Sequence, residues 1–181
     1  SARTLYDLAG TLEGKGRDED ALAYFRGERD YRNCLLVERP NEDFAHTVLR
    51  QLYFAAFMKP YWDRAMTSTN AVVQGVAGKE MAYHIRHAGE WVIRLGDGTE
   101  ESARRMADAV EALSIYVDEL FDSSDAAQDA EKAGVLPVRA EMREAFDAVI
   151  ADVFSQALLT QPDVAYGQRG GRTGQHGEGL G

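Results

Sequence analysis

The chain of 181 residues is long enough for one domain with a substantial core, and its composition, 45% hydrophobic and 28% charged, is ordinary for a globular protein. Its net charge of −10 excludes nucleic acid as a main partner, because phosphate binding needs concentrated positive charge. A single cysteine, Cys34, excludes an internal disulfide and fits a reducing compartment. No apolar run is long enough for a membrane span and no signal peptide pattern opens the chain, so we expect a cytoplasmic protein.

Apolar residues recur at helical spacing from the start of the chain. Residues 2–12 predict a first helix that ends at the following glycines. A second helical run is predicted over residues 18–36, opened by acidic side chains that suit a helix N-terminus. A third helix is predicted over residues 41–66, with a kink at Pro60.

Residues 72–95 predict one long amphipathic helix, around which the rest of the bundle is organised. Two polar residues, Glu80 and His84, fall within its apolar stripe, where an unpaired charge would be costly. Gly75 and Gly78 each lower the stability of a helix by about 1 kcal/mol relative to alanine. We therefore expect a neighbouring helix to approach them closely. The apolar stripe consists of Val73, Ala77, Met81, Ala88, Trp91 and Leu95.

The second half of the chain continues the helical pattern. Thr99 is predicted to cap a helix that runs to Phe121, and residues 123–134 read as a polar surface connection. Pro137 suits the first position of the last helix, and no alternating strand pattern of convincing length occurs anywhere. The predicted fold class is all-α, a helical bundle.

Two regions differ in composition. Residues 1–161 carry the helical pattern, whereas residues 162–181 are glycine-rich and hold almost nothing to bury. We expect this tail to be extended and to gain order only against a partner or a further helix. The opening residues read as the last turns of a helix already under way, and the end lacks a closing element, so we expect the chain to be truncated at both ends.

A polar pair inside a helical bundle raises the question of a di-iron centre. Such a site needs about four carboxylates and two histidines from four facing helices. The helix predicted over residues 44–66 offers no acid at all between Phe44 and Trp62. The acids of the helix predicted to begin after Thr99 all project away from its apolar stripe, toward solvent or a partner. They are Asp108, Glu111, Asp118 and Glu119.

The donor set is therefore incomplete, and we expect no metal, catalytic or cofactor-binding residue in this chain. Glu80 and His84 are candidates for vestigial metal ligands. They are four residues apart, whereas the Glu-x-x-His pair of a di-iron site is three residues apart. A lysine facing the centre would replace the charge of a metal, and Lys59 is the candidate partner for Glu80.

The other polar candidates indicate structural roles. His46 reads as a surface or capping residue, His87 lies at the edge of a stripe, and His176 has no partner in view within the tail. Cys34 reads as a small core residue next to two leucines. The glycine-rich stretch around Arg169 and Arg172 could touch a phosphate, but a solvated turn is the simpler interpretation.

Three long strings of the sequence carry a family resemblance. They are RGERDYRNCLLVERPNEDFAHTVLRQ, KEMAYHIRHAGEWVIRLGDGTEES and GGRTGQHGEGLG, at residues 26–51, 79–102 and 170–181. In this order, and across essentially the whole chain, the sequence closely resembles the C subunits of bacterial phenylacetyl-CoA epoxidase, a multicomponent NADPH-dependent oxygenase of phenylacetate degradation.

The resemblance implies a ferritin-like four-helix bundle with extra helices, lacking helices at both ends. It implies a non-catalytic structural subunit that forms a heterodimer, and higher hetero-oligomers, with a di-iron A subunit. The iron would then belong to that partner, and FAD and an iron–sulfur cluster to a reductase subunit. Glu80 and His84 would be relics of a ligand helix.

Two other function classes stay open at this point. One is a self-sufficient di-iron carboxylate oxidase or iron-binding bundle, which predicts about two irons per chain. The other is a helical binding module unrelated to oxygenases. For the subunit hypothesis, a large apolar interface is needed. Its candidates are Tyr24, Phe25, Tyr53, Phe57 and Tyr61, with internal packing as the alternative.

Overall fold

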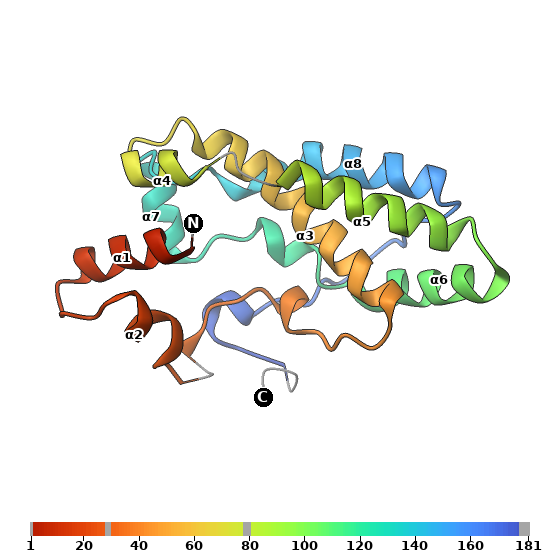
Figure 1. Cartoon of the computed structure of the whole chain (residues 1–181), viewed down its shortest axis with the longest axis horizontal. Coiled ribbons are helices and arrows are strands. Elements are labelled where there is room, and N and C mark those ends of the chain that lie inside the picture. Colours follow the sequence, from red (N-terminus) through yellow and green to blue (C-terminus); the bar gives the residue numbers. More distant parts are fainter. Residues whose placement is uncertain (1, 28–29, 78–80, 178–181) are drawn as a thin grey trace.

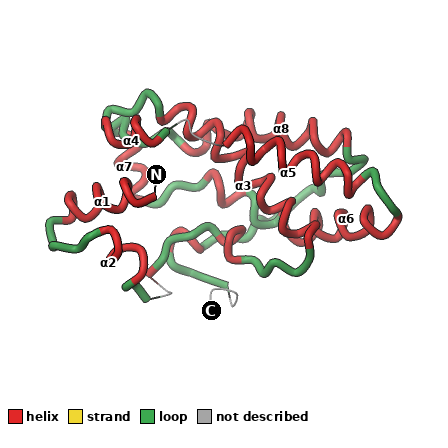
Figure 2. The backbone as a smooth tube through the Cα atoms, viewed as in Figure 1, coloured by secondary structure: helices red, strands yellow, loops and turns green. Residues whose placement is uncertain are grey.

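A computed structural model describes residues 2–27, 30–77 and 81–177, and these residues form helices and loops without a strand (Figure 2). The all-α prediction is confirmed. The α-helices are α1 (Ala2–Glu13), α2 (Glu19–Tyr24), α3 (Phe44–Ala65), α4 (Ala71–Val76), α5 (Met81–Gly96), α6 (Glu100–Ser114), α7 (Asp125–Lys132) and α8 (Arg143–Gln156). Single 3-10 turns lie at Leu35–Glu38, Asp118–Phe121, Arg139–Met142 and Gly171–Thr173.

The main core forms around α3, which packs against α5, α6 and α8 (Figure 1). Helix α5 also packs against α6 and α8. Apolar side chains at helical spacing meet between these four helices, which is the arrangement that amphipathic helices adopt to remove their apolar stripes from water. The largest fully buried side chains of this core are Tyr53, Phe57, Phe146, Leu36, Leu49, Leu52, Met106, Leu120, Met142 and Ile150.

Side-chain caps fix where several helices begin. The carboxylate of Asp43 accepts a hydrogen bond from the backbone N–H of His46 at the start of α3. Thr99 caps α6 as predicted, and Ser102 completes a reciprocal capping box. These caps satisfy backbone donors that have no partner within the helix.

The N-terminal region consists of α1, α2 and α4, with α1 packed against the other two. Helix α1 ends as predicted before Gly14, which has a φ of +67°. The prediction of a continuous helix over residues 18–36 is wrong, because α2 ends at Tyr24 and is followed by irregular backbone and a short turn. Figure 1 shows this region at the end of the molecule opposite the connection between α5 and α6.

The long helix predicted over residues 72–95 is also divided. Helix α4 ends at Val76, and the extended backbone of Ala77, with ψ at 158°, breaks the helical path before α5 begins at Met81. A Cβ added at Gly75 would meet open space, so no helix in the described part of the chain approaches it closely. The corresponding expectation for Gly78 lies outside the described residues, as does Glu80.

Helix α6 ends earlier than predicted, at Ser114 rather than near Phe121. The Ser114 hydroxyl bonds back to the Val110 carbonyl oxygen at 2.7 Å, and the chain then turns before Asp118–Phe121 forms a 3-10 turn. The surface connection that follows contains a full helix, α7. Among the described helices, none combines the length and apolar character needed to cross a membrane.

Candidate functional site

His84 lies on α5 and faces α3, where a metal centre of a four-helix protein would be built. The side-chain amide of Gln51 on α3 donates to Nδ1 of His84 over 3.1 Å. Both side chains are half-buried. The imidazole therefore has a neutral hydrogen-bond partner on the facing helix, which meets the requirement that a buried polar group be paired.

Lys59 lies in the C-terminal part of α3 and is half-buried. Its ammonium Nζ is 2.5 Å from Oδ2 of Asp63, one turn further along the same helix. This i,i+4 pair is ordinary for an exposed helix face and contributes little to stability. The predicted pairing of Lys59 with Glu80 lies outside the described residues.

Deeper in the bundle, hydroxyl groups and aromatic rings fill the space between the helices. The Tyr53 hydroxyl is 3.1 Å from Oγ of Ser114, and both side chains are buried. Burial raises the pKa of Tyr53 to about 12, because the phenolate would lose its hydration. The rings of Phe146 and Phe154 lie beside Tyr53, with centroids 6.1 and 6.2 Å away.

A di-iron group does not fit the donors that the structure describes. Within residues 2–27, 30–77 and 81–177, no group of three or more His, Cys, Asp or Glu side chains could hold a metal ion. Asp108 and Glu111 are exposed on α6 as predicted, and Asp108 pairs with Arg104 at 2.8 Å. The described acids of this helix thus face away from the core, and no redox step can be derived from them.

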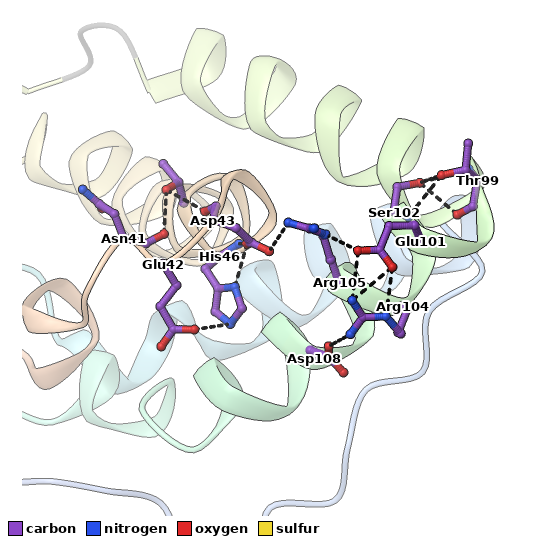
Figure 3. A network of polar contacts seen from close by, with 11 residues as sticks. Asn41, Glu42, Asp43, His46, Thr99, Glu101, Ser102, Arg104, Arg105 and Asp108 are labelled. Atoms are coloured by element: carbon purple, nitrogen blue, oxygen red, sulfur yellow. Dashed lines mark hydrogen bonds and ion pairs between the residues drawn. The ribbon is translucent and has the colours of Figure 1, made fainter.

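The polar network in Figure 3 joins the start of α3 to the start of α6 at the surface. Arg105 approaches Asp43 at 3.6 Å and Glu101 at 2.7 Å. The ring of His46 is buried, with Nδ1 2.8 Å from Asp43 and Nε2 3.5 Å from Glu42. The network ties two helix starts together. The expectation for His46 is wrong, because the residue that caps α3 is Asp43 and His46 is buried against it.

Glu119, a residue predicted to face solvent or a partner, is buried. Only 1% of Glu119 is exposed. The prediction is wrong because it extended the phase of α6 beyond Ser114, whereas the backbone turns there and re-aims Glu119 inward. Its carboxylate accepts hydrogen bonds from the backbone N–H groups of Leu35 at 2.6 Å, Gly170 at 2.9 Å and Arg172 at 3.2 Å.

The glycine-rich tail is ordered against the chain itself. Nδ1 of His176 is 2.7 Å from Oε1 of Glu38, and the side chains are 7% and 1% exposed. Arg169 forms an ion pair with Asp122, and Arg172 donates to the Glu119 carbonyl oxygen. The expectation that the tail needs a partner or a further helix is wrong for residues 167–177.

Cys34 is 4% exposed and belongs to the core, as predicted. Burial raises the pKa of its thiol, because an apolar environment disfavours the thiolate, and this opposes a nucleophilic role. His87 on α5 stacks on the ring of Tyr83, with centroids 5.7 Å apart. Neither residue has a geometry that indicates catalysis.

The five aromatic candidates for an interface divide into two groups. Tyr24 and Phe25 are 76% and 83% exposed at the end of α2. The other three are internal. The guanidinium of Arg139 covers the rings of Phe57 and Tyr61, at 4.7 and 5.2 Å from their centroids. The interface prediction is therefore wrong for the residues on α3, namely Tyr53, Phe57 and Tyr61.

Comparison with known proteins gives two findings. The model of the family described as "Phenylacetic acid catabolic protein" matches residues 1–181. A protein of Escherichia coli (strain K12), named as the C subunit of 1,2-phenylacetyl-CoA epoxidase, is 36% identical over 183 aligned residues, which cover 99% of this chain and 73% of that protein.

Proposed function

The chain belongs to the family of phenylacetic acid catabolic proteins, and from that premise we propose that it is the non-catalytic structural subunit of a phenylacetyl-CoA epoxidase. In this proposal it pairs with the di-iron A subunit in the cytoplasm, within a larger hetero-oligomer. The A subunit holds the iron and carries out the oxygenation. A reductase subunit with FAD and an iron–sulfur cluster supplies electrons from NADPH.

The observation that carries the proposal is the 36% sequence identity to the C subunit of Escherichia coli, which extends over 99% of this chain. The described interior adds support, because its central positions are taken by groups that pair with each other. His84 is bonded to Gln51, and Tyr53 is bonded to Ser114. In this proposal the helices hold their neighbours in place, and the chemistry takes place in the A subunit.

We propose that Tyr24 and Phe25 at the end of α2 contact the A subunit. They are the members of the predicted aromatic set whose rings stay exposed. Aromatic side chains are enriched among residues that carry most of the free energy of binding at protein interfaces. Leu12, which is 75% exposed at the end of α1, adds apolar surface to the same region.

Co-expression with the A subunit tests the proposal. The two chains should elute together on size exclusion, and the complex should convert phenylacetyl-CoA when the reductase is present. The double change Tyr24→Ser and Phe25→Ser should reduce co-elution, whereas Tyr166→Ser, at an 88% exposed tyrosine of the tail, should not.

The variant His84→Ala separates a structural role from a catalytic one. The assembled complex should keep its activity, since the described hydrogen-bond partner of this histidine is a neutral amide, Gln51. A complex whose activity disappears while its folding and assembly are intact would contradict the proposal and favour a self-sufficient di-iron oxidase.

A further inference from the structure

Residues 167–177, which we call the latch, cross two segments that are distant in sequence. They contact residues 32–39 before α3 and residues 115–122 after α6. Figure 1 shows this C-terminal segment beside the turn that precedes α3. The N–H of Gln168 donates to the Ile115 carbonyl oxygen at 2.6 Å, at one edge of the contact.

Glu119 joins all three segments through one carboxylate. Its Oε2 accepts from the N–H of Leu35, and its Oε1 accepts from the N–H groups of Gly170 and Arg172. Each of these bonds is charge-assisted, and such bonds are stronger than neutral ones. When the latch leaves, the buried carboxylate loses two of its three donors and keeps the N–H of Leu35.

A second polar contact lies near the other end of the latch. His176 and Glu38 form their buried pair there, while Nε2 of His176 and Oε2 of Glu38 have no hydrogen-bond partner among the described residues. Arg169 and Asp122 add an ion pair that is largely exposed. The incompletely satisfied pair makes this contact weaker than its burial suggests, because each unpaired buried polar atom carries a desolvation cost.

The latch contributes almost no apolar surface to the core. Gly171 and the polar His176 side chain are its buried groups, and the apolar core cluster ends before the tail, at Leu159. Gly171 lies directly on the backbone around Cys34. A Cβ added there would be 2.3 Å from the Asn33 carbonyl oxygen and 3.1 Å from the Leu35 nitrogen.

The latch therefore packs against the backbone on both sides of Cys34. Burial raises the pKa of its thiol, and the Arg172 guanidinium on the latch is close enough to act against that rise. A segment held by a few polar bonds, with little apolar burial, opens at a lower free energy than the core to which it is attached.

We propose that the latch is a conformational device that opens as a unit around Glu119 while the helical core stays folded, and that each opening uncovers Cys34. The closed state shields the thiol, and the open state makes it reactive. Glu119 is the positioning residue of this device, since it holds both latch N–H groups and the segment next to the thiol.

The rate at which a thiol reagent modifies Cys34 tests this in the full chain. Glu119→Gln should raise the rate roughly 10- to 100-fold, the factor that a hydrogen bond to a charged group contributes. Both carboxylate oxygens of Glu119 accept from backbone N–H groups, so either orientation of the glutamine amide sets its NH₂ group against an N–H donor and loses a hydrogen bond. The matched control is Glu111→Gln, which removes the same charge from an exposed site on α6 and should leave the rate unchanged.

Two further measurements separate opening of the latch from unfolding. The helical circular dichroism of Glu119→Gln should match that of the parent protein, and modification should depend on denaturant less steeply than global unfolding does. Gly171→Ala provides a second variant, because its methyl group would clash with the Asn33 carbonyl oxygen and push the latch away, and it should also speed modification. The proposal is overturned if both variants react at the parent rate, or if Cys34 reacts only with the full denaturant dependence of global unfolding.

Discussion

The helical core and the N-terminal region use similar sequence patterns with different results. Helices α1 and α6 are both strongly amphipathic. Helix α6 buries apolar side chains such as Met106 and Leu113, whereas α1 buries only Gly10 and leaves Leu12 75% exposed. An amphipathic pattern thus shows that a helix has an apolar face, and the surrounding fold decides whether that face is covered.

This contrast should appear first in stability. Replacing Phe146 with alanine empties a fully buried position in contact with Tyr53 and Phe121, and should cost about 3–5 kcal/mol in the free energy of unfolding. Phe25→Ala makes the same chemical change at an 83% exposed position and should cost almost nothing. Denaturant unfolding measures both. Equal losses would show that α2 is packed as tightly as the core.

The buried Tyr53 predicts a dependence on alkaline pH. Its pKa is raised to about 12 in the folded state, while the unfolded state releases the proton near 10. The unfolded state then binds fewer protons between these values, so the contribution is complete below pH 10 and falls by about 2–3 kcal/mol as pH rises to 12.

Tyr53→Phe removes that titration and should flatten this part of the stability curve. Chemical denaturation at a series of pH values compares the two proteins. Identical alkaline losses in the parent and the variant would contradict a protected Tyr53 hydroxyl.

Alanine substitutions at two glycines, each adding a single methyl group, test the same difference between the core and the N-terminal region. A Cβ at Gly96, the last residue of α5, would lie 2.3 Å from the Ala157 carbonyl oxygen, so Gly96→Ala should destabilise the protein by about 1–3 kcal/mol. Gly75→Ala in α4 meets open space and should be neutral or stabilising, by up to about 1 kcal/mol. Thermal unfolding should show a lower Tm for Gly96→Ala and an unchanged or higher Tm for Gly75→Ala, and a loss at Gly75 would reveal a neighbour against α4.

The smallest effect concerns the start of α6. Thr99→Ala removes the side-chain acceptor of the capping box and should cost about 1 kcal/mol. Thr160→Ala, at an exposed position outside the helices, is the matched control and should cost little. Hydrogen exchange at the first amides of α6 should increase only in the first variant, and unchanged protection there would show that the capping box does not stabilise this helix start.

The sequence predicts the parts of the fold that depend on local pattern. The all-α class, the first helix, the Thr99 cap and the burial of Cys34 follow from spacing and residue type. The break at Ala77 does not, because nothing in the apolar spacing around it marks an interruption.

The buried contacts of Glu119 and of the Glu38–His176 pair are harder to predict from the sequence, for a physical reason. Glu119 follows a three-residue change of backbone path after Ser114, and a periodicity carried past that point places it on the wrong face. The pairing of Glu38 with His176 joins residues that lie 138 positions apart. Local sequence holds no information on such a contact, and only the folded path of the chain brings the two side chains together.

The central claim is that this chain supports an oxygenase without holding iron itself. Iron content per chain, measured on the protein purified alone and on its complex with the A subunit, tests this most directly. The account predicts almost no iron in the isolated chain, with all the iron of the complex assigned to the A subunit. About two irons in each isolated chain, lost on His84→Ala, would contradict it.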